Sequence, residues 1–195
     1  MPVVTGLRET RGGRVAVELD GARWRTLPLD VVARVALGVG EELDRARLRE
    51  LARELRRARA LDAGLRALAR RDLSSAALAG RLERRHVGAA DREATVAMLA
   101  RAGLVDDERY ASRRAESLAE RGHGDEAIRW RLQREGIPEA VAAGAVGALE
   151  PERARADRIV TMRGRGPATA RELARRGFGE DAVEAALGSA VADEP

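Results

Sequence analysis

The stretch that decides the fold is "HGDEAIRWRLQREGI", residues 123–137, because two other stretches of the chain repeat its pattern. They are "LSSAALAGRLERRHV" at 73–87 and "GPATARELARRGF" at 166–178. Aligning the three on a shared leucine, Leu82, Leu132 or Leu173, also aligns the residue pairs at 86–87, 136–137 and 177–178. With a helix before and after each stretch, the repeating unit is about 40–50 residues long, which is typical of stacked helical modules.

Residues 1–43 have a different period. Val15, Val17 and Leu19 alternate with more polar residues, as in a half-buried strand. The glycines of "RGGR" (11–14) and "DGA" (20–22) tolerate the positive φ of tight hairpin turns. We expect two or three short antiparallel strands near 3–9, 14–19 and 22–27, and a helix from about Leu29 to Leu37 that covers one face.

From Asp44, which is placed as an N-cap, leucines recur at helical spacing, and a break is expected near 58–62. The predicted fold is mainly α: three tandem three-helix-bundle repeats in an elongated, curved arrangement, preceded by a small N-terminal β-hairpin or meander and a helix. The predicted domains are the β-hairpin plus helix at 1–43, a linker helix at 44–59, helical repeats at 60–106, 107–149 and 150–190, and a disordered tail at 191–195.

The composition indicates a soluble protein of the cytoplasm. Cysteine is absent, so disulfides and thiolate metal sites are excluded. The N-terminus lacks the apolar core of a signal peptide. The most apolar stretch, "AVAAGAVGAL" at 140–149, is about half the length of a membrane span, which needs roughly 20 residues. Every basic side chain that is not histidine is arginine, and the net charge is only +4, so DNA binding would need local arginine clusters.

The stretch "RAGLVDDERYA", residues 101–111, bunches three acids that could hold a metal, act as catalytic carboxylates or start a helix. Gly103 can close the preceding helix in the left-handed conformation, and Leu104 and Val105 can enter the core. Asp106 or Asp107 can cap the next helix, on whose first turns Tyr110 lies, a cap being worth about 1 kcal/mol. We therefore expect these acids to be architectural.

The sequence contains no motif that indicates catalysis. Without lysine, an ordinary Walker phosphate loop is impossible. The two histidines, His86 and His123, lie at joints between helices and have no neighbour at metal-binding spacing. We expect no catalytic residue, cofactor or metal.

Arginines cluster on the repeated stretches and beside them, and they are the candidate contacts to a protein or DNA partner. The functional interpretation is a basic surface for an acidic groove or for nucleic acid, since guanidinium pairs bidentately with carboxylate or phosphate. The alternative is a solvated helix face balanced by Glu83, Glu126, Glu135 and Glu172. The candidates are Arg81, Arg84 and Arg85; Arg113, Arg114 and Arg121; Arg129, Arg131 and Arg134; and Arg171, Arg175 and Arg176.

The chain resembles the RecX family of RecA regulators. The resemblance lies in "GLVDDERYA" (103–111), "RGHG" (121–124) and "AIRWRLQREGI" (127–137), in that order and spacing, while "VELDG" (17–21) and "GVGEELDRARLREL" (38–51) resemble the family's N-terminal extension. The third repeat matches least well. The motif residues, which we expect to be structural, are Gly103, Leu104, Asp106, Asp107, Tyr110, Gly122, Gly124, Ile128, Leu132, Gly136 and Ile137.

This resemblance implies a non-enzymatic protein of DNA repair and recombination. Such proteins bind the groove of the RecA–DNA filament and mostly inhibit ATP hydrolysis and strand exchange. We therefore expect a monomer whose partner is the RecA filament and which can also contact single- or double-stranded DNA. One alternative is a sequence-independent DNA-binding helical protein that acts without RecA. Another is a structural adaptor with an unrelated partner.

Overall fold

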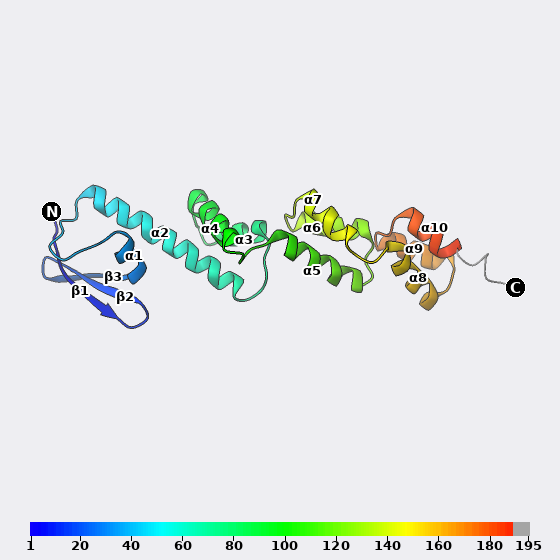
Figure 1. Cartoon of the computed structure of the whole chain (residues 1–195), viewed down its shortest axis with the longest axis horizontal. Coiled ribbons are helices and arrows are strands. Elements are labelled where there is room, and N and C mark those ends of the chain that lie inside the picture. Colours follow the sequence, from blue (N-terminus) through cyan, green and yellow to red (C-terminus); the bar gives the residue numbers. More distant parts are fainter. Residues whose placement is uncertain (189–195) are drawn as a thin grey trace. The chain divides into compact units, whose positions relative to one another are not determined.

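The structure is a computed structural model that describes residues 1–188. The tail predicted at 191–195 and the last two residues of the predicted third repeat lie outside the described residues. The chain is mainly helical with one small sheet, which confirms the predicted fold class (Figure 1). The strands are β1 (Val4–Thr10), β2 (Arg14–Leu19) and β3 (Ala22–Pro28). The helices are α1 (Leu29–Arg34), α2 (Arg45–Leu68), α3 (Ser75–Glu83), α4 (Ala89–Arg101), α5 (Asp107–Glu120), α6 (Asp125–Arg134), α7 (Glu139–Gly147), α8 (Glu152–Arg163), α9 (Pro167–Arg175) and α10 (Glu180–Gly188).

Two compact units make up the chain. Unit 1 consists of Met1–Arg71 and Ala79–Leu99, and unit 2 consists of Asp72–Leu78 and the chain from Ala100 onward. The division therefore runs through α3, whose first turn belongs with unit 2 and whose remainder belongs with unit 1.

The sheet of unit 1 is an antiparallel meander in the order β1-β2-β3. Val15 and Val17 are 3% and 0% exposed, so the alternation in the sequence does mark the buried face of β2. In the three-residue β1–β2 turn, Gly12 and Gly13 have positive φ, and in the two-residue β2–β3 turn both Asp20 and Gly21 do. Turns of this kind match the twist of paired strands, and they form here where the glycines predicted them.

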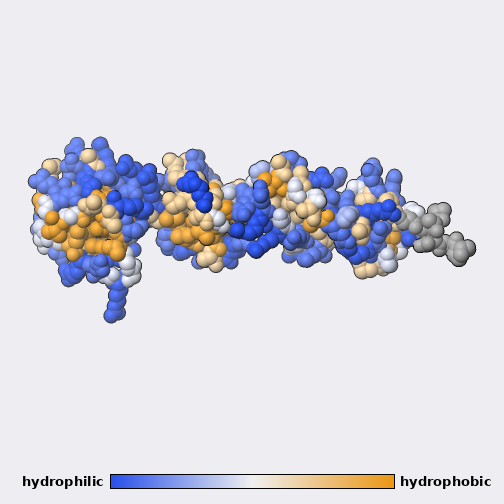
Figure 2. Space-filling view, viewed as in Figure 1, coloured by the Kyte–Doolittle hydropathy of each residue, from blue (hydrophilic) through white to orange (hydrophobic). Residues whose placement is uncertain are grey.

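The core of unit 1 forms between this sheet, α1 and the first half of α2. Its buried residues are aliphatic and come from these elements and from the segment that joins α1 to α2: Val4, Val15, Val17, Leu27, Val31, Val32, Val35, Leu37, Leu43, Leu51 and Leu55. Figure 2 shows hydrophobic areas over the end of the chain that holds the sheet and over α4, each bordered by hydrophilic side chains.

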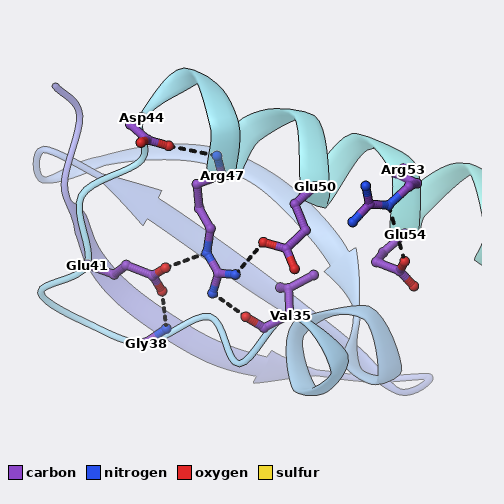
Figure 3. Close-up of polar contacts among 8 residues, drawn as sticks. All are labelled: Val35, Gly38, Glu41, Asp44, Arg47, Glu50, Arg53 and Glu54. Carbon is purple, nitrogen blue, oxygen red and sulfur yellow. Dashed lines mark hydrogen bonds and ion pairs between the residues drawn. The ribbon is translucent and has the colours of Figure 1, made fainter.

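Arg47 fastens the loop before α2 to the helix (Figure 3). Asp44 caps α2 by accepting a hydrogen bond of 2.7 Å from the Arg47 amide. The Arg47 guanidinium donates to Glu41, to the carbonyl of Val35 and, at 2.7 Å, to Glu50. These contacts give hydrogen bonds to carbonyl and carboxylate groups of the loop, which would otherwise be removed from water without a partner. The hydrogen bond from Arg47 also lowers the pKa of Glu41.

Helix α2 runs without interruption from Arg45 to Leu68, so the break expected near 58–62 is wrong. Residues 58–62 (ARALD) include neither glycine nor proline, and the first four are strong helix formers, so nothing there ends a helix. Gly64 lies inside α2 for a different reason: a Cβ there would lie 2.9 Å from Leu99 Cδ1 of α4. The glycine lets these two helices pack closely.

Unit 2 contains two bundles of the predicted kind. The core of α5, α6 and α7 consists of Ala111, Ala115, Leu118, Ile128, Leu132, Ile137, Ala142, Ala145 and Val146. The core of α8, α9 and α10 consists of Ala156, Val160, Leu173, Phe178 and Ala186. Small alanines and few aromatics suit short helices at close distance. Among the described helices, none is both long enough and apolar enough to cross a membrane.

Candidate partner-binding surface on helix α6 and the repeat junctions

The middle helices of the repeats, α3, α6 and α9, have equivalent positions. Leu82, Leu132 and Leu173 are each 0% exposed, which confirms the alignment on these leucines. Two residues later, near the C-terminal end of each helix, stand the exposed Arg84, Arg134 and Arg175. A basic residue in the last turn also favours the helix dipole, so the position has a structural explanation as well as a functional one.

Two of the three acids of residues 101–111, Asp106 and Asp107, accept hydrogen bonds from backbone amides at helix starts. Asp106 caps α5 by accepting a hydrogen bond of 2.9 Å from the Arg109 amide. Asp107 has a role that the sequence did not indicate: its Oδ1 accepts a hydrogen bond of 2.7 Å from the amide of Ser75, the first residue of α3. One repeat therefore caps the middle helix of the repeat before it. Within residues 1–188, no group of three His, Asp or Glu side chains is placed to hold a metal ion.

Glu135, at the end of α6, completes this first junction. Its carbonyl accepts a hydrogen bond of 2.9 Å from the buried Ser74 hydroxyl. Its carboxylate accepts hydrogen bonds from the Tyr110 hydroxyl at 2.8 Å and from Arg114 Nη2 at 2.7 Å. The hydrogen bond to Glu135 raises the pKa of Arg114 above its usual value. Arg114, a predicted partner contact, is thus half-buried and bound to a carboxylate inside unit 2.

The second junction repeats the first with different side chains. Glu152, near the start of α8, accepts a hydrogen bond of 2.6 Å from the amide of Asp125, the first residue of α6. The Gly124 amide donates to the carbonyl of Arg176 at 2.9 Å. The buried Arg155 donates to the His123 carbonyl at 2.9 Å and pairs with Asp125. Each middle helix in unit 2 thus ends against the start of the middle helix before it.

The glycines after α6 and α9 are required by these junctions. Gly136 and Gly177 have φ of +81° and +77°. A Cβ on Gly136 would overlap the Cβ of Ala76, and one on Gly177 would lie 2.6 Å from the Cβ of Ala127. The equivalent residue of the first repeat is His86, which has φ of +59° and is exposed. A side chain is tolerated at that position, whereas glycine is needed where a preceding repeat packs against it.

The other motif residues are placed as follows. Gly103 and Gly122 have positive φ and close the helices before them, while Gly124 is buried where a Cβ would overlap the backbone of Gly177. Val105 is buried but Leu104 is 49% exposed, so the prediction that both enter the core is wrong. Successive residues of an extended segment point in opposite directions, so only one of the two faces inward. Ile128 and Ile137 are buried in the core of the second bundle.

The most exposed aromatic side chain among the described residues is Trp130 of α6. It is 54% exposed, and the guanidinium of Arg134 lies 4.7 Å from the centre of its ring. The sequence contained a signal that our prediction missed: Trp130 lies midway between the buried Ile128 and Leu132, which places it on the opposite side of the helix. Arg131 follows it and Arg129 precedes it, and both are half-buried. We call Arg129, Trp130, Arg131 and Arg134 the α6 surface.

The remaining candidate arginines divide between the two units. Arg81, Arg84 and Arg85 lie in unit 1 and the others in unit 2. Arg113 pairs with Asp72 at 2.9 Å, both side chains being about two thirds exposed, which makes the pair weak. Arg171 donates to the carbonyl of Pro167 at 3.1 Å. Arg121 and Arg175 are exposed, and neither pairs with a carboxylate in the described part of the chain.

Positive charge also gathers around His123, at the start of α6. Burial lowers the pKa of His123, and the charges of Arg131, Arg176, Arg121 and Arg114 lower it further. Two of these arginines are already paired with carboxylates, Arg114 with Glu135 and Arg176 with Glu172.

The comparisons agree with this architecture. The family model described as "RecX, second three-helix domain" matches residues 106–146, which hold α5, α6 and all but the end of α7. A curated relative, "Regulatory protein RecX" of Halorhodospira halophila, is 34% identical over 143 residues, which are 68% of this chain and 89% of the relative. The solved "Crystal structure of regulatory protein RecX" covers 97% of this chain and 100% of its own, with a TM-score of 0.83 at 20% identity. RecX from Lactobacillus salivarius covers 69% of this chain and 96% of its own, with a TM-score of 0.62 at 14% identity. The order of the motifs, the match to the second bundle and the identity to the curated relative together show that this chain belongs to the RecX family.

Proposed function

We propose that the chain is a non-enzymatic regulator that binds the groove of the RecA–DNA filament and mostly inhibits ATP hydrolysis and strand exchange by RecA. The α6 surface is its principal contact. Membership of the RecX family, in which a curated relative is named a regulatory protein, supports the first part of this proposal. The second part rests on the exposure of Trp130 beneath the guanidinium of Arg134.

An exposed tryptophan with an arginine beside it is the composition found at the energetic centres of protein interfaces. Stacking holds the Arg134 guanidinium in place before binding, so less conformational entropy is lost when it meets a partner carboxylate. The carboxylate closest to Arg134 in sequence, Glu135, is already bound to Tyr110 and Arg114, so it does not neutralise Arg134. The α6 surface therefore fits a partner that presents acidic groups around an apolar pocket.

The absence of catalysis is supported by how the acids are used. Asp106 and Asp107 accept hydrogen bonds from backbone amides at helix starts, and so does Glu152. A carboxylate that is occupied in this way stabilises the fold and is poorly placed to carry protons or bind substrate.

The proposal is tested by steady-state ATP hydrolysis of RecA on single-stranded DNA, titrated with this protein, with filament length followed by electron microscopy. Hydrolysis is expected to fall and filaments to shorten as the protein is added. The Trp130→Ala variant should need at least about tenfold more protein for the same inhibition, the loss expected at an energetic centre. Met162→Ala removes another exposed apolar side chain, 76% exposed on α8, and should behave like the wild type. Unchanged hydrolysis and filament length at saturating protein would refute the proposal.

A further inference from the structure

Unit 1 carries two open concavities that border the same part of α2. The larger, about 750 Å³, lies between α2 and the β2–β3 side of the sheet, including the turn at Gly12–Gly13. The smaller, about 340 Å³, lies between α2 and the loop that joins α3 to α4. Arg59 and Arg66 line both of them. The two concavities are therefore neighbours along one side of α2.

Their charged lining contains twice as many arginines as aspartates. The arginines are Arg14, Arg25, Arg56, Arg59, Arg66 and Arg85, and the aspartates are Asp30, Asp62 and Asp91. Each aspartate already has an arginine partner: Arg34 for Asp30, Arg66 for Asp62, and Arg56, at 3.6 Å, for Asp91. The other four arginines of the lining pair with no carboxylate among the described residues. We call Arg14, Arg25, Arg59 and Arg85 the arginine groove.

These four side chains are exposed, and the fold uses them little. Arg14 donates one hydrogen bond of 3.2 Å to the carbonyl of Thr26 in the neighbouring strand. Arg25 lies 4.6 Å from the centre of the Trp24 ring, which orients its guanidinium and leaves its N–H groups at the edge free to donate. Such guanidinium groups bind phosphate in a bidentate manner.

The arrangement fits a polymer better than a small anion. The four arginines are spread over both concavities: Arg14 and Arg25 line only the larger one, Arg85 in the loop after α3 lines only the smaller one, and Arg59 lines both. On α2, Arg59 and Arg66 are separated by two helical turns, about 10 Å along the axis. The charged side chains that line the two concavities are mainly arginine, which suits phosphate groups better than the apolar anchors of a bound peptide.

We propose that the arginine groove binds the phosphodiester backbone of nucleic acid directly, without RecA. This goes beyond the proposed function, which places the RecA contact on α6 in unit 2. The binding is independent of base sequence, because phosphate contacts position a protein on nucleic acid but carry no sequence information.

The test is fluorescence anisotropy with a labelled thymidine oligonucleotide and with a duplex of the same length, in the absence of RecA. Four phosphate contacts predict a loss of affinity of about 50-fold for the single strand between about 50 and 200 mM salt, and about 150-fold for the duplex. The variant R14A/R25A/R59A/R85A should lose this salt-dependent part of the affinity. The probe with the higher affinity, the single-stranded oligonucleotide or the duplex, identifies the form of nucleic acid that the arginine groove prefers.

Two controls separate this proposal from its alternatives. R11A/R49A removes exposed arginines of unit 1 that line neither concavity, and it should bind DNA like the wild type. Charge reversal of Arg129, Arg131 and Arg134 should abolish the effect on RecA but preserve the contribution of the arginine groove. The proposal is overturned if the groove variant keeps the affinity and salt dependence of the wild type. It is also overturned if the wild type binds neither oligonucleotide at low salt, or if polyglutamate displaces DNA as effectively as unlabelled DNA does. Far-UV circular dichroism of each variant confirms that folding is unchanged.

Discussion

Replacing Gly136 by alanine should destabilise unit 2 far more than the same replacement at Gly103. Both glycines have positive φ, +81° at Gly136 and +68° at Gly103, so both substitutions impose the left-handed strain of an L-residue, about 1–2 kcal/mol. Only Gly136 faces another repeat, because its Cβ would overlap Ala76, whereas a Cβ on Gly103 meets nothing within 4 Å. Overpacking of this kind costs a further 1–3 kcal/mol or so. We therefore expect Gly136→Ala to lower the free energy of unfolding by about 2–5 kcal/mol, and Gly103→Ala by about 1–2 kcal/mol.

The assay is urea denaturation of the full chain, followed by the fluorescence of Trp130 in a Trp24→Phe background, so that the signal comes from unit 2. The double variant A76G/G136A should recover the steric part of the loss, with a coupling free energy of about 1–3 kcal/mol between the two positions. Equal losses for Gly136→Ala and Gly103→Ala, or no coupling to Ala76, would show that repeat junctions do not depend on close approach at this glycine.

Three further predictions concern acidity, the loop of unit 1 and the α6 surface. The pKa of His123 is lower in the folded chain than in the unfolded chain, so the unfolded chain takes up the proton first. The free energy of unfolding should therefore fall as the pH drops through about 6.5, and it should level off below the pKa of His123 in the folded chain. If a His123→Gln variant showed the same pH dependence as the wild type between about pH 5 and 7, this prediction would be wrong. Arg47→Ala should cost about 1–3 kcal/mol in thermal or urea denaturation, because the Val35 carbonyl loses its guanidinium donor and Glu41 keeps only the amide of Gly38. A loss below about 0.5 kcal/mol would show that water replaces the guanidinium. Trp130→Ala should change the free energy of unfolding by no more than about 0.5 kcal/mol, because the side chain is largely exposed; a large loss would show that Trp130 belongs to the core.

Local signals in the sequence predicted most of the elements. The alternation of Val15 and Val17 identified β2, the paired turn residues identified the hairpins, and the shared leucine aligned the three middle helices. The Asp106 cap followed from helix-start chemistry and is observed. The strand, the turns and the cap depend on residues close together in the chain, and the shared leucine depends on a local pattern that repeats, so periodicity and capping rules suffice.

Long-range contacts could not be predicted in the same way. Arg114 looked like a free basic residue because its partner, Glu135, is 21 positions away. Asp107 looked like a second candidate cap for α5, yet it caps α3, which begins 32 positions earlier. The uninterrupted course of α2 was missed because a change of packing partner along a helix, from the sheet to α4, needs no break in its sequence. The exposure of Trp130 could have been predicted from the sequence, because its spacing from Ile128 and Leu132 places it on the side of the helix away from the core.

The measurement that tests the central claim most directly compares two charge reversals in the RecA ATPase titration. R129E/R131E/R134E alters the α6 surface, while R11E/R23E/R45E makes the same change in net charge at exposed arginines of unit 1 that pair with no carboxylate in the described structure. The proposed function predicts that the α6 variant no longer inhibits ATP hydrolysis and that the unit 1 variant inhibits like the wild type. Full inhibition by the α6 variant would contradict the assignment of the RecA contact to this helix.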